Sequence, residues 1–333
     1  MKIERVIIWG HELHDHTHSY IHNAFCIGFK KLNYETHWLQ DNIENRTKVD
    51  INNSLIIAHG LKTNYLPISD TSIYILHNTE LKIINSDNEK IPKKYYCETE
   101  KGIPEENIVT LQVYTNDCLG RDKPHGILPY HYYMEPPNKT LYMPWATDLL
   151  PEQIDENINN LESIVKKTDV NKLNINFVGM ITDKWGKVRE YCNKNNINFN
   201  NSGGTFNISH ESNKTIEENV KLIQESIVAP AIQTDWQVEN GYIPCRIFKN
   251  ISYGKMGVTN NPIVNKLFND KLIYNENIET LLEKSIDYEK NTNLSEKIEK
   301  IKELMIEVRD KHTYINRCNY ILEYIGKYYN INE

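Results

Sequence analysis

Histidine residues are concentrated in one short stretch near the amino terminus, GHELHDHTHSY, which begins at Gly10. Its four histidines are His11, His14, His16 and His18. An imidazole ring binds transition metals such as zinc, and it also exchanges a proton near neutral pH. Asp15, in the middle of the stretch, could serve as a general base beside them. The residue types therefore predict either a metal site or a site of proton transfer.

The elements on either side of this stretch predict where it lies in the fold. RVIIWGH at residues 5–11 predicts a buried strand, and SYIHNAFCIGFKKLN at 19–33 predicts an amphipathic helix. Further strands are predicted at 34–41, 54–60, 72–78, 94–99 and 107–114. Short, continuous apolar runs of this kind are typical of strands covered on both faces, and therefore of a mostly parallel sheet. A strand, a helix and a second strand at the start of the chain indicate a Rossmann-like domain.

In an open parallel sheet, ligands bind beyond the carboxyl ends of the strands. His11 follows the first predicted strand, and His59 and His77 lie at the ends of two others. We therefore expect these histidines and the histidine-rich stretch to lie together at one edge of the sheet. Zinc needs a complete set of ligands, and the sequence has no HExxH motif or downstream Cys/His motif to supply one. The expected chemistry is proton transfer, without a metal.

A proline-rich segment at residues 123–155 separates the two halves of the chain, because its prolines exclude long regular elements. After it, the pattern of strand, loop and helix begins again at 173–186. Residues 214–230 predict a helix that opens with a capping box of Thr215 and Glu218. The end of the chain predicts helices with apolar stripes. We expect an α/β protein of two Rossmann-like domains, residues 1–150 and 151–333.

The second half contains a second candidate site, in the segment that runs from Ala229 to Asn261. Arg246 and Lys249 precede the sequence NISYGKMGVT. If a helix begins within residues 248–253, its backbone N–H groups and the Ser252 hydroxyl would face a phosphate, and the two cations would supply charge. Gly254 and Gly257 would then let the chain turn into a strand.

Composition excludes several classes of protein. The 333 residues carry a net charge of −7 and no conspicuous basic block, so we expect no nucleic-acid partner. The first residues lack the apolar core of a signal peptide, and no stretch approaches the ~18 apolar residues of a transmembrane helix. The six cysteines form no CxxC motif or close pair, which argues against a disulfide framework. These features predict a cytoplasmic protein with no transmembrane segment.

Several segments resemble a known enzyme family. FVGMITDKWG, PCRIFKNISYGKMGVTNN followed by LIYNE, and VRDKHTYINR are similar to parts of the C-terminal donor domain of spore-maturation-type glycosyltransferases. LYMPWATD resembles the segment that leads into that domain. The resemblance implies a GT-B fold, in which two Rossmann-like domains face each other across a cleft and C-terminal helices pack back toward the N-terminal domain. It also implies sugar transfer from a UDP- or GDP-linked nucleotide sugar to a glycan or other hydroxyl acceptor, with no cofactor.

The resemblance also implies roles for particular residues. In that family a segment like Arg246 to Asn260 lines the nucleotide-sugar pocket. The implied donor-binding residues of this segment are Arg246, Lys249, Asn250, Ser252, Tyr253 and Gly254. Gly179 would let the backbone approach the diphosphate. A departing nucleoside diphosphate gains negative charge, which a helix N-terminus and these cations would stabilise without Mg²⁺.

One departure from the wider GT-B pattern concerns stereochemistry. Many retaining GT-B enzymes carry two glutamates, separated by seven residues, before a glycine turn. When Gly254 is aligned with that turn, Gly241 and Lys249 occupy the two glutamate positions. The missing acids favour an inverting enzyme, with Asp15 or His16 as the base that deprotonates the acceptor. The expected acceptor-binding residues are His11, His14, His18, His59 and His77.

Three other functions remain open at this point. A nucleotide-sugar epimerase or hydrolase would use the same donor pocket without a separate acceptor. A non-catalytic sugar- or nucleotide-binding protein would use the histidines only as structural residues. A metal-dependent hydrolase would bind its metal with the HxHxH run of His14, His16 and His18.

Overall fold

The computed structural model divides the chain into two compact units. The first unit comprises Met1–Trp145, Asn240–Tyr242 and Tyr314–Glu333, and the second comprises Ala146–Glu239 and Ile243–Thr313. The structure describes residues 3–11, 18–60, 63–77, 82–84, 90–92, 103–113, 132–133, 140–168, 170, 173–179, 184–202 and 214–329. This division differs from the predicted one in its last segment, because residues 314–333 belong to the first unit.

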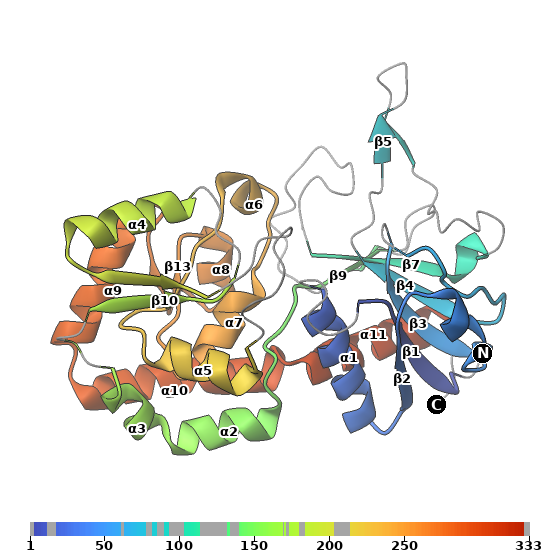
Figure 1. The fold of residues 1–333 in the computed structure, drawn as a ribbon, viewed down its shortest axis with the longest axis horizontal. Helices are drawn as coiled ribbons and strands as arrows, with labels where there is room; N and C mark the ends of the chain where they lie inside the picture. The colour runs from blue at the N-terminus through green and yellow to red at the C-terminus, as the bar shows by residue number, and fades with distance from the viewer. Residues whose placement is uncertain are drawn as a thin grey trace. The chain divides into compact units, whose positions relative to one another are not determined.

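The first unit is built on a seven-stranded sheet, counted over the described residues, in the order β2-β1-β3-β4-β7-β9-β8. Its strands are β1 (Arg5–Trp9), β2 (Glu35–Leu39), β3 (Ser54–His59), β4 (Ile73–His77), β7 (Ile108–Gln112), β8 (Tyr132–Tyr133) and β9 (Thr140–Tyr142). All neighbours pair in parallel except β8 and β9 (Figure 1). A separate antiparallel pair consists of β5 (Lys82–Ile84) and β6 (Lys90–Pro92). The parallel sheet predicted from the apolar runs is confirmed, and the strand predicted at 94–99 lies outside the described residues.

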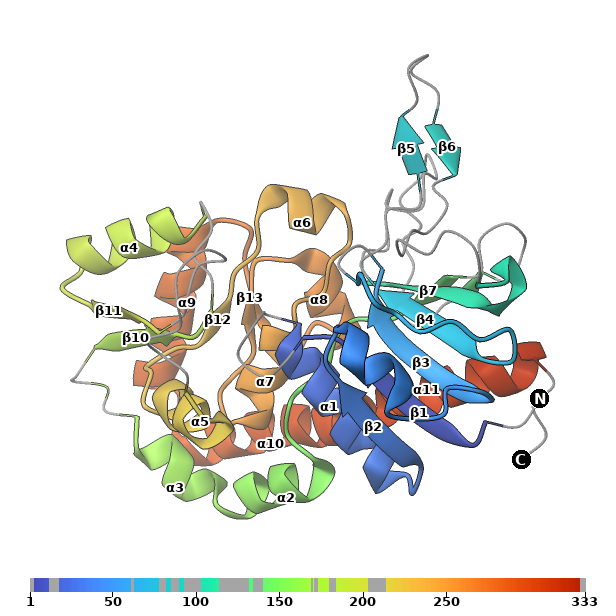
Figure 2. The ribbon, with the colours of Figure 1, turned by 45° about the vertical axis from the view of Figure 1, so that its right-hand side comes forward.

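Two helices from opposite ends of the chain pack together in this unit, α1 (Ser19–Lys31) and α11 (Tyr314–Tyr329) (Figure 2). The rings of Phe25 and Tyr314 meet edge to face, with centroids 5.0 Å apart. Gly28 allows the close approach, since a Cβ there would lie 2.8 Å from Cys318 Sγ. These long-range contacts explain why the last helix belongs to the first unit. Two short 3₁₀ helices complete the unit, Ile43–Thr47 and Glu105–Asn107.

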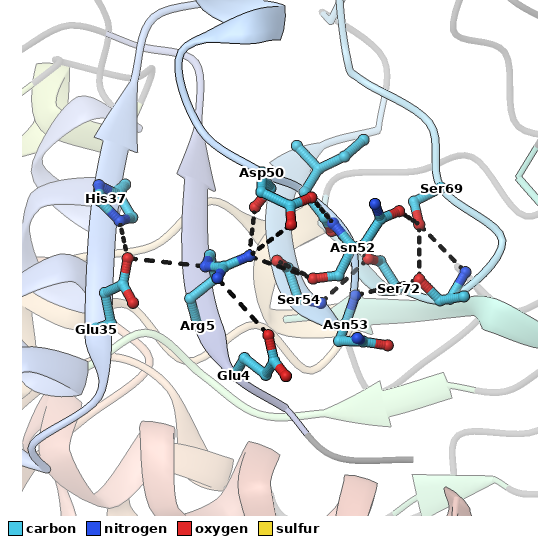
Figure 3. A network of polar contacts seen from close by, with 12 residues as sticks. Glu4, Arg5, Glu35, His37, Asp50, Asn52, Asn53, Ser54, Ser69 and Ser72 are labelled. Atoms are coloured by element: carbon cyan, nitrogen blue, oxygen red, sulfur yellow. Dashed lines mark hydrogen bonds and ion pairs between the residues drawn. The ribbon is translucent and has the colours of Figure 1, made fainter.

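Arg5 ties the strands together at the amino edge of the sheet (Figure 3). Its guanidinium donates to the Asp50 carbonyl at 2.8 Å and lies 3.7 Å from the Glu35 carboxylate. A hydrogen bond joins the starts of β3 and β4, in which the Ser54 N–H donates to Ser72 Oγ at 3.1 Å. The polar groups at this edge are therefore used to fix the register of the strands.

The second unit holds two small parallel sheets, β10-β11 and β12-β13-β14. Its strands are β10 (Asn174–Phe177), β11 (Asn198–Asn201), β12 (Pro230–Ala231), β13 (Val258–Thr259) and β14 (Ile273–Tyr274). Its helices are α2 (Pro151–Asn159), α3 (Leu161–Lys166), α4 (Lys184–Lys194), α5 (Ile216–Gln224), α6 (Asp235–Glu239), α7 (Cys245–Ser252), α8 (Pro262–Leu267), α9 (Ile278–Asn291) and α10 (Leu294–Lys311). Figure 1 shows α4 on one side of these strands and α2, α3, α5 and α10 on the other.

Two apolar clusters form the core of the second unit, one on each side of the strands. Trp185 of α4 packs with Phe177 of β10 at a centroid distance of 3.8 Å, in a cluster that also includes residues of α9. Phe248 of α7 and Met305 of α10 belong to the other cluster. The predicted capping box of α5 is confirmed, because Thr215 Oγ1 accepts from the Glu218 N–H at 3.2 Å. Within the part of the chain that the structure describes, no helix combines the length and the apolar character needed to cross a bilayer.

Candidate functional site

Five histidine rings gather at the carboxyl edge of the first unit's sheet. We call this cluster the histidine edge; its members are His11, His18, His22, His59 and His77. Neighbouring ring centroids are 5.0 to 5.8 Å apart. The prediction that His11, His18, His59 and His77 lie together is therefore confirmed. His14, Asp15 and His16 lie outside the described residues, so their roles stay predictions.

The histidines reach this edge from several elements. His59 and His77 are the last residues of the paired strands β3 and β4, and they are opposite each other in the register. His18 immediately precedes α1, and His11 follows β1. Gly10 and His11 both have positive φ angles, +91° and +54°. Histidine is one of the residues that tolerates this left-handed conformation, which directs the chain out of β1 at the edge.

His22 is a member that the sequence analysis missed. Its Nδ1 donates to the Gly10 carbonyl at 2.9 Å, because that oxygen can only accept. With a neutral ring, His22 Nε2 then accepts from His77 Nε2 at 2.7 Å. The available signal was helical spacing, since His22 lies four residues after His18 and therefore on the same face of the helix.

Three of the five histidines are buried. His22, His59 and His77 are at most 2% exposed. Burial, with the neighbouring rings of His22 and His18, holds the pKa of His77 well below its ordinary value. Trp145 packs edge to face on His77, with centroids 5.6 Å apart. A neutral imidazole offers both an N–H donor and a lone pair, so the edge can bind hydroxyl groups or a metal ion.

The second unit has its own polar edge, at the carboxyl end of β10. Arg246, in the first turn of α7, places its guanidinium carbon 4.3 Å from the centroid of the Phe177 ring. Its Nη2 donates to the Val178 carbonyl at 3.5 Å. Gly179 has a φ of +138°, and a Cβ on it would lie 2.5 Å from Arg246 Nη2. The structure thus brings together two of the predicted donor-binding residues, Gly179 and Arg246.

Two further helices start shortly after strands of this unit, and an ion pair joins their first residues. Lys184, the first residue of α4, forms an ion pair with Asp235, the first residue of α6. The next residue, Trp236, is 55% exposed, and α6 follows closely after the carboxyl end of β12. We call Gly179, Lys184, Asp235 and Arg246 the arginine edge. An exposed indole beside such an edge suits a sugar or a base, and the sequence analysis did not single it out.

The helix that carries Arg246 differs from the predicted one. It begins at Cys245, so the predicted helix start within residues 248–253 is wrong, and Ser252 is its last residue. Pro244 fixes the start, because proline has no N–H to place in the first turn. The predicted turn into a strand is confirmed: Gly254 has a φ of +91°, and β13 follows.

Lys249 is engaged inside the second unit. Its Nζ lies 2.7 Å from Asp148 Oδ2, and the Tyr253 hydroxyl donates to Asp148 Oδ1 at 2.6 Å. Burial lowers the pKa of Lys249, but the Asp148 carboxylate outweighs this effect and raises it overall. Burial and the same carboxylate raise the pKa of Tyr253 well above its ordinary value. The three residues form a structural network.

The remaining predicted donor-binding residues are buried in contacts of the second unit. Asn250 donates to the Ala229 carbonyl at 2.7 Å, and Ser252 Oγ lies 2.7 Å from Thr147 Oγ1. Gly254 packs against Ile164, whose Cγ2 would be 3.0 Å from a Cβ at this position. These contacts give Asn250, Ser252 and Gly254 structural roles, whereas Gly179 and Arg246 lie at the arginine edge.

A shallow cavity of about 380 Å³ lies elsewhere in the second unit, between α2 and α5. Its lining mixes apolar and charged side chains such as Leu149, Val220, Glu156 and Lys221. None of its lining residues belongs to the predicted sites.

No protein-family model matches the chain, and no curated protein matches its sequence. The fold is similar to that of an alpha-glucosyltransferase solved at 1.9 Å in complex with UDP and a 13-mer DNA containing an HMU base. The TM-score is 0.53 at 9% identity, over 97% of this chain and 99% of that chain. An alpha1,3-fucosyltransferase solved with GDP-fucose gives a TM-score of 0.39 at 11% identity, over 99% of this chain and 91% of that chain. The first similarity confirms the predicted α/β fold of the GT-B glycosyltransferases.

Proposed function

We propose that this protein is a glycosyltransferase that moves a sugar from a nucleoside-diphosphate donor to a hydroxyl acceptor. The observation that carries the proposal is the shared fold, over nearly the whole of both chains, with an alpha-glucosyltransferase solved with UDP. The arginine edge supports it independently, because a cation, a helix start and a glycine lie where open α/β sheets bind ligands.

The donor diphosphate is bound by the arginine edge in this proposal. The backbone N–H groups in the first turn of a helix carry the positive end of its dipole, and Arg246 lies in the first turn of α7. Gly179 has no side chain to keep a phosphate away from the backbone, and Arg246 lies beside it. Lys249 is already paired with Asp148, so Arg246 supplies the charge that stabilises the departing diphosphate. No Mg²⁺ is needed for this step.

The transfer is proposed to invert the anomeric carbon. Asp15 or His16 takes the proton of the acceptor hydroxyl, its oxygen attacks the anomeric carbon, and the bond to the diphosphate breaks with its electron pair on the leaving group. The acceptor hydroxyls are held at the histidine edge in this proposal. The acceptor is a glycan or another hydroxyl compound, since the net charge of −7 gives the chain no general attraction for DNA.

Product analysis tests this function. The full chain is incubated with UDP- or GDP-sugars and a panel of hydroxyl acceptors, and products are followed by mass spectrometry and by NMR of the anomeric proton. We expect a glycosylated acceptor with the anomeric configuration opposite to that of the donor. Free sugar formed without any acceptor product would instead show a hydrolase, and an isomerised donor would show an epimerase.

The proposed base is tested by replacing Asp15 with Asn and His16 with Ala together. We expect turnover to fall by about 100-fold or more, because loss of a general base typically costs that much. Donor binding should persist. His37→Ala is the matched control, since His37 lies on β2 and bonds Glu35. Unchanged turnover in the double variant would exclude both residues as the base.

A further inference from the structure

Three of the five imidazoles at the histidine edge have the arrangement of a metal-binding set. One ring nitrogen from each of His11, His18 and His59 lies within 4.8 Å of the other two. The three residues come from separate elements: the turn after β1, the residue before α1 and the end of β3. This trio shares only His18 with the HxHxH run of the sequence.

We propose that His11, His18 and His59 bind one divalent transition-metal ion, with Zn²⁺ as the ion that suits them best. Three protein nitrogens with one open position are the usual arrangement of a catalytic zinc site, in which water or a substrate oxygen takes the fourth place. Neutral imidazoles prefer Zn²⁺, Cu²⁺, Ni²⁺ and Co²⁺ to Mg²⁺ or Ca²⁺, which prefer oxygen.

The other two histidines of the edge are positioning residues. His22 and His77 bond each other through their Nε2 atoms at 2.7 Å. His22 also holds the Gly10 carbonyl at 2.9 Å, and this bond fixes the backbone directly before His11. A buried histidine pair that orients the neighbouring segment resembles the outer-shell support that metal sites commonly have.

The geometry needs only a small adjustment to accept the ion. Two nitrogens bound to Zn²⁺ at the usual bond length of about 2.1 Å in a tetrahedral site are about 3.4 Å apart. The nitrogens of the trio, within 4.8 Å of one another, reach this separation by shifts of about 1 Å or less, which side-chain rotation supplies. His59 is 2% exposed, so the site is anchored in the core on one side.

The test uses the untagged full chain, freed of metal with EDTA and then titrated with Co²⁺, with Zn²⁺ as competitor. We expect one equivalent of Co²⁺, visible absorption bands of a four- or five-coordinate ion, and displacement by Zn²⁺. Three variants each remove one ligand: His11→Asn, His18→Asn and His59→Gln. Asparagine tolerates both the left-handed backbone at 11 and the position before a helix at 18. Each variant should bind Co²⁺ at least about tenfold more weakly.

His37→Ala is the control, and it should bind Co²⁺ as the wild type does. Thermal melting of the metal-free proteins shows that each variant is folded. No cobalt spectrum in the wild type, or equal binding by all three ligand variants, would overturn the metal site. The proposal does not depend on the proposed function: UDP binding that persists in EDTA reports on the arginine edge, and Co²⁺ binding reports on the histidine edge.

Discussion

The carboxyl edges of the two units use opposite kinds of polar group. The histidine edge is a cluster of imidazoles in which burial lowers the pKa of His77, whereas the arginine edge holds a permanently charged guanidinium beside a glycine. A neutral imidazole can exchange a proton, donate and accept hydrogen bonds, and ligate a metal, whereas a guanidinium stays protonated and only donates hydrogen bonds. The guanidinium binds phosphate oxygens in either of their protonation states. In the proposed function, the histidine edge is the acceptor side and the arginine edge is the donor side.

The amino edge of the first sheet shows what polar groups do away from the ligand side. There, Arg5 is surrounded by Glu35, Asp50 and backbone carbonyls, and its charge is used for holding strands (Figure 3). Lys249 of α7 resembles Arg5 in this respect, because it pairs with Asp148. Arg246 and Lys249 lie on one short helix, so α7 offers a direct comparison between a structural cation and the cation proposed to bind the donor.

The largest expected effect is a loss of stability when Lys249, the structural cation of α7, loses its partner. Asp148→Ala leaves the half-buried Lys249 without its carboxylate and Tyr253 without its acceptor. Breaking a buried pair from one side typically lowers stability by about 3–5 kcal/mol. Chemical denaturation should show this loss, whereas UDP affinity of the folded protein should stay near the wild-type value. Wild-type stability in Asp148→Ala would mean that the network of Asp148, Lys249 and Tyr253 contributes nothing to the free energy of unfolding.

Arg246→Ala tests whether the other cation of α7 binds the donor nucleotide. We expect UDP to bind about 10- to 100-fold more weakly, because hydrogen bonds to charged groups contribute about 1.5–3 kcal/mol. The melting temperature without ligand should change little. Arg189→Ala is the matched control, since Arg189 also lies over a ring, that of Phe199, but on the exposed face of α4. Equal losses in both variants, measured by calorimetry, would argue against a specific role for Arg246.

A buried cation near the end of α7 predicts a dependence of stability on pH. Burial lowers the pKa of Lys255 to about 8, although Nζ donates to the Ser226 carbonyl at 2.6 Å. Between pH 8 and pH 10 the unfolded chain therefore binds more protons than the folded one, so stability rises with pH. The expected gain is about 2 kcal/mol. Lys255→Met should remove this rise in denaturation curves; a persisting rise would assign it to another group.

The smallest expected effect comes from Gly179→Ala. The positive φ angle and the contact with Arg246 Nη2 both oppose a Cβ, so stability should fall by about 1–2 kcal/mol. UDP should bind more weakly as well, because the guanidinium must move. Gly186→Ala on α4 is the control: a Cβ there meets nothing within 4 Å, and alanine favours helix. If Gly179→Ala and Gly186→Ala had the same stability and the same UDP affinity, the close approach of Arg246 to Gly179 would not matter.

Much of the fold could be predicted because its signals are local. The buried strands are continuous apolar runs, and the convergence of His11, His59 and His77 follows from the rule that parallel strands end at one edge. His22 was also accessible, by counting one helical turn from His18. These inferences need only the sequence near each residue.

The features that escaped prediction depend on distant residues. Lys249 pairs with Asp148, which lies 101 residues earlier, so the sequence near α7 did not distinguish it from Arg246. The resemblance implied that C-terminal helices pack back toward the first domain, but not the contacts by which the last helix does so: Cys318 and Tyr314 pack on Gly28 near the other end of the chain. The start of α7 was missed for a local reason, since Pro244 marks it and was overlooked.

The central claim is that the arginine edge binds a nucleoside diphosphate without a metal. Its most direct test is thermal melting of the wild type with UDP and with GDP, each in the presence of EDTA. A ligand at about 100 times its Kd adds about 2.7 kcal/mol, which raises the Tm by several degrees. We expect such a rise with one of the two nucleotides, and we expect Arg246→Ala to reduce it to about half or less. No rise with either nucleotide, or the same rise in Arg246→Ala, would contradict the account.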